Sequence, residues 1–169
     1  MRTLILGAVL ALTLAAPAAA ETTPADAAKA ACKAEKSELG TKLFKRGYGV
    51  KSTAKAMAAC IAKAEPVAED AAENAAQECK TERDADAAAF AEKYGTNKNK
   101  KNAYGKCVSG KTQDAVDDAT EDRVNAAKTC KALRADDKAA FEEQHGTKKN
   151  AFGKCVSATV KADDEEQQG

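Results

Sequence analysis

Residues 130–157 read CKALRADDKAAFEEQHGTKKNAFGKCVS, and residues 79–109 follow the same plan as CKTERDADAAAFAEKYGTNKNKKNAYGKCVS. A degenerate third copy, CKAEKSELGTKLFKRGYGVKSTAKAMAACI, occupies residues 32–61. In each stretch a cysteine is followed after 11 or 12 residues by phenylalanine, and five residues later by glycine. A second cysteine comes 9 to 12 residues after that glycine. Three stretches with one spacing indicate an internal repeat, so we expect the chain to consist of similar structural units.

The repeat sets the domain boundaries that we predict. These are a signal peptide at 1–20, a degenerate first segment at 21–65, a second segment at 66–115, a third segment at 116–160 and a disordered acidic tail at 161–169. The tail reads KADDEEQQG and has almost no apolar side chain that could pack on a core. The three segments are therefore the parts of the chain expected to fold.

Each segment is predicted to form a helix, a short helix, a turn and a second helix. Aromatic residues of the short helix lie four positions apart, as in Phe141 and His145, which places both on one helical face. We expect Asp84 and Asp136 to cap the short helices of the second and third segments. The glycine after each short helix is expected to end it in a left-handed conformation.

The stretches that join the segments are also predicted to be helical. Residues 111–134 contain no glycine or proline and alternate in charge, as a solvated helix does. Pro66 is expected to kink or to start the corresponding helix before the second segment. The predicted fold class is therefore all-α, with three disulfide-stapled helical hairpin-like repeats joined by helical linkers.

The N-terminus has the pattern of an export signal. Arg2 provides a positive start, an uncharged apolar run extends from Leu4 to Ala16, and Ala18 to Ala20 form a small-residue cleavage site. This run is shorter than the ~20 residues needed to span a bilayer, so no membrane span is expected after cleavage. We therefore predict a secreted or extracytoplasmic protein of the cell envelope.

Export would place all six cysteines in an oxidising compartment, where an even number predicts disulfides. The staples are needed, because only about a tenth of residues 21–169 are Leu, Ile, Val or Phe. Pairing within segments is favoured because each second cysteine lies in the apolar stripe of its helix. The favoured pairs are Cys32–Cys60, Cys79–Cys107 and Cys130–Cys155. The main alternative joins neighbours across the linkers, as Cys60–Cys79 and Cys107–Cys130.

Few residues suggest catalysis. The chain has no Cys-x-x-Cys motif, and its cysteines are too far apart for the ligand spacing of zinc sites. The lone histidine, His145, occupies the position of Tyr48 and Tyr94 in the other segments and is interpreted as a packing residue. We therefore predict a non-enzymatic structural or interaction module without a cofactor. The sequence does not identify its partner, for which another exported protein and an anionic envelope polymer are the candidates. An enzyme of unknown class is the least favoured alternative.

The loops after the short helices carry the only binding signal. Near-zero net charge, with 27 Lys and Arg against 26 Asp and Glu, removes the general electrostatic argument for a nucleic-acid-binding protein. Lysines beside a helix N-terminus could nevertheless hold phosphate or sulfate, which makes binding of an anionic envelope polymer or nucleic acid the alternative function. The bland interpretation is that these lysines only keep the loops solvated. The candidate anion-binding residues are Lys98, Lys100, Lys101, Lys148 and Lys149.

Two of the quoted strings resemble a known pattern. YGT at 94–96 and NAFGKCVS at 150–157 are similar to a cysteine-containing repeat found in small exported proteins of high-GC actinobacteria. The resemblance extends over residues ~30 to 158, with the first copy poorly matched. It implies export and a modular chain, and it carries no activity or site residue to this sequence.

Overall fold

The computed structural model describes residues 22–167, and all regular structure in that range is helical. The predicted signal peptide lies outside the described residues. The six helices are α1 (Pro24–Gly47), α2 (Thr53–Ala85), α3 (Ala87–Tyr94), α4 (Ala103–Asp136), α5 (Lys138–His145) and α6 (Ala151–Gln167). None of these helices is long and apolar enough to cross a membrane.

Three disulfides join the helices, and their pairing confirms the prediction. The bonded pairs are Cys32–Cys60, Cys79–Cys107 and Cys130–Cys155, with Cα–Cα distances of 5.9, 6.1 and 6.0 Å. The alternative pairing across the linkers is therefore wrong. Three disulfides in one chain indicate an oxidising environment, and together with the helices they confirm an all-α fold with disulfide staples.

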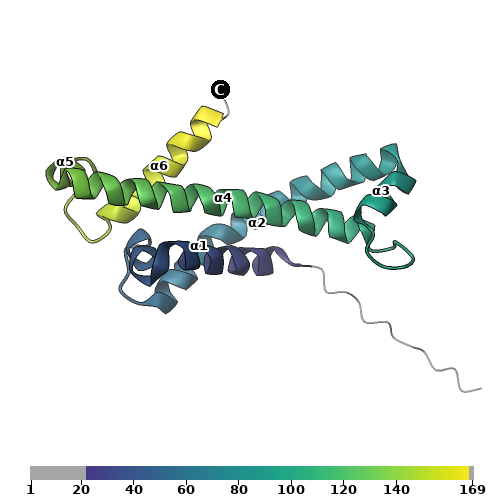
Figure 1. Cartoon of the computed structure of the whole chain (residues 1–169), viewed down its shortest axis with the longest axis horizontal. Helices are drawn as coiled ribbons and strands as arrows, with labels where there is room; N and C mark the ends of the chain where they lie inside the picture. The colour runs from purple at the N-terminus through teal and green to yellow at the C-terminus, as the bar shows by residue number, and fades with distance from the viewer. Residues whose placement is uncertain (1–21, 168–169) are drawn as a thin grey trace, which may run out of the picture.

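Each of the two longest helices carries one end of two different disulfides. Helix α2 contains Cys60 and Cys79, and α4 contains Cys107 and Cys130, which confirms that the linkers are helical. Helix α4 crosses most of the molecule, with α3 near one end and α5 at the other (Figure 1). At 1.5 Å per residue, the two cysteines of α4 lie about 35 Å apart. The disulfides thus tie α1 to α2, α2 to α4, and α4 to α6.

The long helices pack through small side chains rather than large ones. Helix α1 contacts α2, α4 and α6, while α4 also contacts α2 and α6. Small residues allow helix axes to approach closely, so packing of this kind compensates for the shortage of large apolar residues. The cluster where α1, α2 and α4 meet consists of Ala27, Ala28, Ala31, Ala68 and Val116.

Each short helix has its N-cap four residues before its phenylalanine. In α3 and α5 the capping residues are Asp86 and Asp137, whose carboxylates accept hydrogen bonds from backbone N–H groups of the first turn. The predicted caps Asp84 and Asp136 are therefore wrong: both are exposed residues near the ends of the preceding long helices. In α1 the same position is Gly40, whose φ of 68° interrupts the helix.

Other local predictions need correction. The glycines that follow the short helices differ, since Gly49 and Gly146 have positive φ but Gly95 has a φ of −73°. Glycine is required at 95 for a different reason: a Cβ there would lie 2.5 Å from the Ala91 carbonyl oxygen. Helix α2 runs uninterrupted past Pro66, so Pro66 does not start a helix.

Helix α6 extends further than the sequence analysis expects. It continues to Gln167, through most of the segment assigned to a disordered tail. The reason is that no glycine or proline occurs between Lys154 and Gly169, and the intervening residues include several good helix formers.

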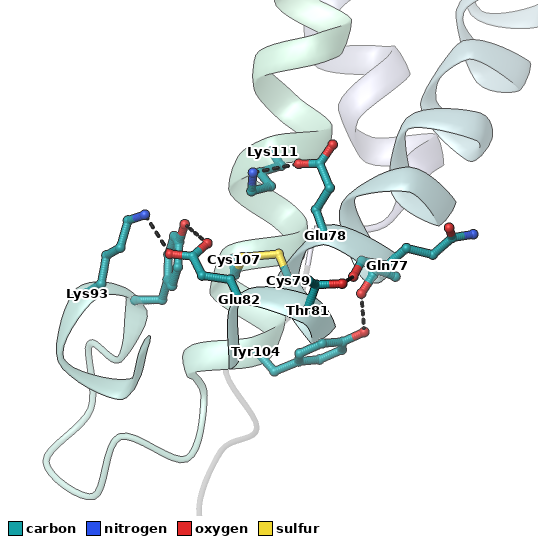
Figure 2. Close-up of a disulfide and its surroundings, with 11 residues drawn as sticks. Gln77, Glu78, Cys79, Thr81, Glu82, Lys93, Tyr104, Cys107 and Lys111 are labelled. Carbon is teal, nitrogen blue, oxygen red and sulfur yellow. Dashed lines mark hydrogen bonds and ion pairs between the residues drawn. A yellow bond between two sulfur atoms is a disulfide. The ribbon is translucent and has the colours of Figure 1, made fainter. Parts of the chain in front are cut away.

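The second disulfide is surrounded by contacts between helices (Figure 2). Cys79 and Cys107 are both fully buried. Beside them, the Lys111 ammonium lies 2.6 Å from the Glu78 carboxylate, and the Tyr104 hydroxyl donates to the Ala76 carbonyl at 3.0 Å. These polar contacts join α2 to α4 on both sides of the sulfur atoms.

Replacing this disulfide by the double substitution Cys79→Ala/Cys107→Ala should lower the free energy of unfolding by about 3.5 kcal/mol, because it releases a loop with a sequence separation of 28. Urea unfolding followed by circular dichroism measures the change. A decrease smaller than about 1 kcal/mol would show that packing, and not the staple, holds α2 to α4.

Candidate functional site

A buried carboxylate fixes the turn between α1 and α2. Glu35 of α1 is 3% exposed, and its Oε2 accepts a hydrogen bond from the Tyr48 hydroxyl at 2.6 Å. Arg123 of α4 approaches the same carboxylate, with Nε 3.6 Å from Oε1, and its guanidinium lies 4.9 Å from the Tyr48 ring centroid. The buried negative charge is therefore balanced by a cation from another helix.

The corresponding positions in the other segments explain the lone histidine. In the second segment Tyr94 donates to Glu82 at 2.9 Å, repeating the contact of Tyr48 with Glu35. In the third segment the acid is replaced by Leu133, which is 48% exposed, and the tyrosine by His145. The His145 ring lies 4.8 Å from that of Phe141. This ring contact supports the interpretation of His145 as a packing residue.

The turn held by Tyr48 contacts the start of α6 through glycines. A Cβ on Gly153 would lie 2.7 Å from the Gly47 carbonyl oxygen, and one on Gly49 would lie 3.5 Å from Cα and Cβ of Asn150. We call this contact of Gly47, Gly49, Asn150 and Gly153 the glycine junction. It brings two turns together that are about 100 residues apart in the sequence.

A basic hollow lies on one side of the glycine junction, and we call it the Arg46 hollow. Its volume is about 540 Å³, and it also includes Val50, Thr147 and Phe152. No carboxylate lines it, and none of its cations forms an ion pair among the side chains that the structure describes. The cations that line it are Lys42, Lys45, Arg46, Lys51, Arg134, Lys148 and Lys149.

A second hollow of about 490 Å³ lies on the other side of the junction, and we call it the Lys63 hollow. Its charged lining residues are Lys63, Lys154 and Lys161, and again no carboxylate contributes. Gly49 lines both hollows, so the two are adjacent. Together they form one surface, the basic face, to which ten cationic side chains contribute.

The five lysines predicted to bind anions lie at two separate places in the structure. Lys148 and Lys149 line the Arg46 hollow. Lys98, Lys100 and Lys101 lie in the loop between α3 and α4, near the other end of α4 (Figure 1). The Lys100 ammonium is also committed, since it donates to the Gly95 carbonyl at 3.0 Å and lies 3.4 Å from Glu92.

Sequence reasoning missed most of the basic face. Lys42, Lys45, Arg46 and Lys51 all come from the first segment, whose loop has lost the Lys/Asn pattern of the other two. A usable signal existed, because residues 41–52 contain these four cations and no acid. The contribution of Arg134 depends on docking between segments and has no local sequence signal.

The described part of the chain offers few groups for metal binding or thiol chemistry. No group of His, Cys, Asp and Glu residues there could hold a metal ion, and every cysteine is bonded to another. No family model, curated protein or solved structure gives a significant match to this sequence. Within the described residues, the basic face is therefore the feature that bears most directly on function.

Two helical glycines provide a matched test of the glycine junction. Gly153→Ala should lower the free energy of unfolding by about 1–3 kcal/mol, since the new Cβ meets a backbone oxygen. Gly110→Ala should instead raise it by about 0.5–1 kcal/mol, because no atom lies within 4 Å and alanine favours the helix. Chemical denaturation of both variants measures the difference, and stabilisation by both would contradict the close contact.

The turn should also respond to alkaline pH. Burial raises the pKa of the Tyr48 phenol above its usual 10.0, and the Glu35 carboxylate adds to the effect while Arg123 opposes it. The phenol stays protonated in the folded state but ionises above pH 10 when unfolded, so its contribution to stability is complete below pH 10 and declines above it.

We expect the stability deficit of Tyr48→Phe relative to wild type to shrink above pH 10, by up to about 1.4 kcal/mol per pH unit. Urea unfolding of both proteins at pH 8, 9, 10 and 11 provides the measurement, because lysine titration is common to the two. A deficit that is the same at pH 8 and pH 11 would mean that Tyr48 ionises equally easily in both states.

Proposed function

We propose that this chain is an exported, non-enzymatic interaction module that binds an anionic polymer through the basic face. The observation that carries the proposal is the gathering of ten cations around two adjacent hollows without a lining carboxylate. Export is supported by the sequence of residues 1–20 and by the three disulfides.

Charge segregation makes the near-zero net charge misleading. Residues 64–79 of α2 contain five acids and no Lys or Arg, whereas residues 41–52 contain four cations and no acid. Cations held together without acids repel one another, so the basic face lowers the stability of the folded chain unless an anion is near. A surface of this kind supports binding of a polyanion, which neutralises several of the charges at once.

The shape of the basic face favours a polymer over a single small anion. The two hollows lie on either side of the glycine junction, so an extended chain that crosses the junction would meet cations along its path. Helix α6 begins at Ala151, and the partial positive charge of its N-terminus adds to the field there. The aromatic ring of Phe152 lines the Arg46 hollow, and the Arg46 guanidinium lies 5.8 Å from the centroid of that ring.

The proposal is tested with long-chain inorganic polyphosphate as the probe. The variant Lys45→Gln/Lys148→Gln/Lys149→Gln should bind it on the order of tenfold more weakly at low salt. The slope of log affinity against log salt concentration should also become shallower by about 0.7 for each phosphate that the variant no longer neutralises. Binding is measured by fluorescence anisotropy of labelled polyphosphate between 20 and 200 mM NaCl.

The control is Lys98→Gln/Lys101→Gln, which removes two exposed lysines, one fewer than the test variant, from the loop at the other end of α4. This control should bind like wild type, with an unchanged salt slope. Equal weakening per removed charge in both variants would indicate attraction by overall charge and would contradict a site at the basic face. No measurable binding by the wild-type protein would exclude polyphosphate-like polymers altogether.

A further inference from the structure

A separate, more enclosed pocket lies where α1, α2, α4 and α6 meet. Its volume is about 300 Å³, at the lower end of the range for small-molecule sites. Most of its wall is apolar and built from short side chains, which leave the space unfilled. The apolar lining consists of Ala31, Ala64, Val67, Val116, Ala119, Val160 and the Cys32–Cys60 disulfide.

The polar end of the pocket contains a buried hydrogen-bond donor that lacks an acceptor. The buried Nε of Arg123 has no hydrogen-bond partner among the described residues, because the Glu35 carboxylate is 3.6 Å away. Glu35 Oε2 already accepts from Tyr48, and the Thr120 hydroxyl donates to the Val116 carbonyl. A buried donor without an acceptor is unfavourable, and a ligand oxygen beside the guanidinium would supply an acceptor.

Lys63 adds a cation at the boundary between this pocket and the basic face. Lys63 and Tyr48 line both the pocket and the Lys63 hollow, so the polar end of the pocket adjoins a region rich in cations. Burial lowers the pKa of Lys63, as does the nearby Arg123 guanidinium, while Glu35 opposes the shift. Asp122 also lines the pocket, beside Glu35, Tyr48, Lys63 and Arg123, and it has an interaction partner of its own.

We propose that this pocket binds a small aliphatic monocarboxylate, with its hydrocarbon body against the alanine and valine wall and its carboxylate between Lys63 and Arg123. The apolar wall excludes a strongly hydrated ligand, and the two donors at one end select an acceptor head group. A carboxylate brings a negative charge and two acceptor oxygens to both cations, whereas an alcohol is neutral with a single oxygen and a protonated amine has no acceptor. The site shares Lys63 with the basic face, but the proposal does not rest on polymer binding there.

Titration of the disulfide-bonded protein with sodium octanoate tests the proposal, using isothermal calorimetry and the methyl NMR signals of Val116 and Val160. Saturable binding is expected, and shortening the chain to hexanoate should weaken it by up to about 4-fold per methylene. Octylamine and octanol should bind more weakly than octanoate. An absence of saturable binding, or tighter binding of octylamine, would overturn the proposal.

Two substitutions on α4 form a matched pair for the hydrocarbon end. Ala119→Leu places extra atoms in the pocket and should abolish octanoate binding, whereas Ala115 is exposed and does not line the pocket, so Ala115→Leu should leave binding unchanged. If both variants bind like wild type, the ligand does not occupy this pocket.

Recognition of the head group is tested with Lys63→Gln, which should weaken octanoate binding more than tenfold and leave octanol binding unchanged. Equal effects on octanoate and octanol would contradict a role for Lys63 in binding the carboxylate. Because Lys63 is only partly buried, this variant is expected to fold.

Discussion

Three disulfides placed on shared helices are the constraint on which the rest of the structure depends. Large apolar residues are scarce, and the described core contains only four phenylalanines among its buried side chains. Without disulfides, the conformational entropy lost on folding would exceed the stabilisation that so small a core provides. Because α2 and α4 each carry cysteines of two different disulfides, a bond in one segment also fixes the orientation of the next. The staples thereby convert locally stable helices into one connected arrangement.

Within that arrangement, small residues decide how closely the helices approach. The alanine cluster lets α1 lie against both α2 and α4, and this packing brings Arg123 of α4 to the buried Glu35 of α1. Tyr48 then bonds to Glu35 and holds the first turn in a fixed position. That turn meets the start of α6 at the glycine junction, so the cations on both sides of it come together. The basic face is therefore a consequence of packing between the first and third segments, and neither segment contains it alone.

This dependence explains which features were predictable from the sequence. The spacing of cysteines, aromatic residues and glycines within each segment predicts helices and within-segment disulfides, because those contacts are local. The capping residues were misplaced by one or two positions, since Asp84 and Asp136 stand close to Asp86 and Asp137 and all four are good caps by residue type. Lys148 and Lys149 were recognised as candidates, but Arg134 and the cations of residues 42–51 join them only through tertiary contacts. Likewise, no sequence pattern indicates that the Arg123 Nε is buried without an acceptor.

The shared-helix arrangement of the disulfides also determines how the chain would transmit force. A pull applied between Cys32 and Cys155 passes through the sulfur bridges and bypasses the three closed loops. Only the 19 residues from Cys60 to Cys79 and the 23 from Cys107 to Cys130 bear the load. Fully stretched, these stretches extend to about 150 Å, against about 430 Å for the same 123-residue interval without bridges. The disulfides thus limit the maximum extension of the oxidised chain. The loops that contain the aromatic pairs and the turns do not bear the load.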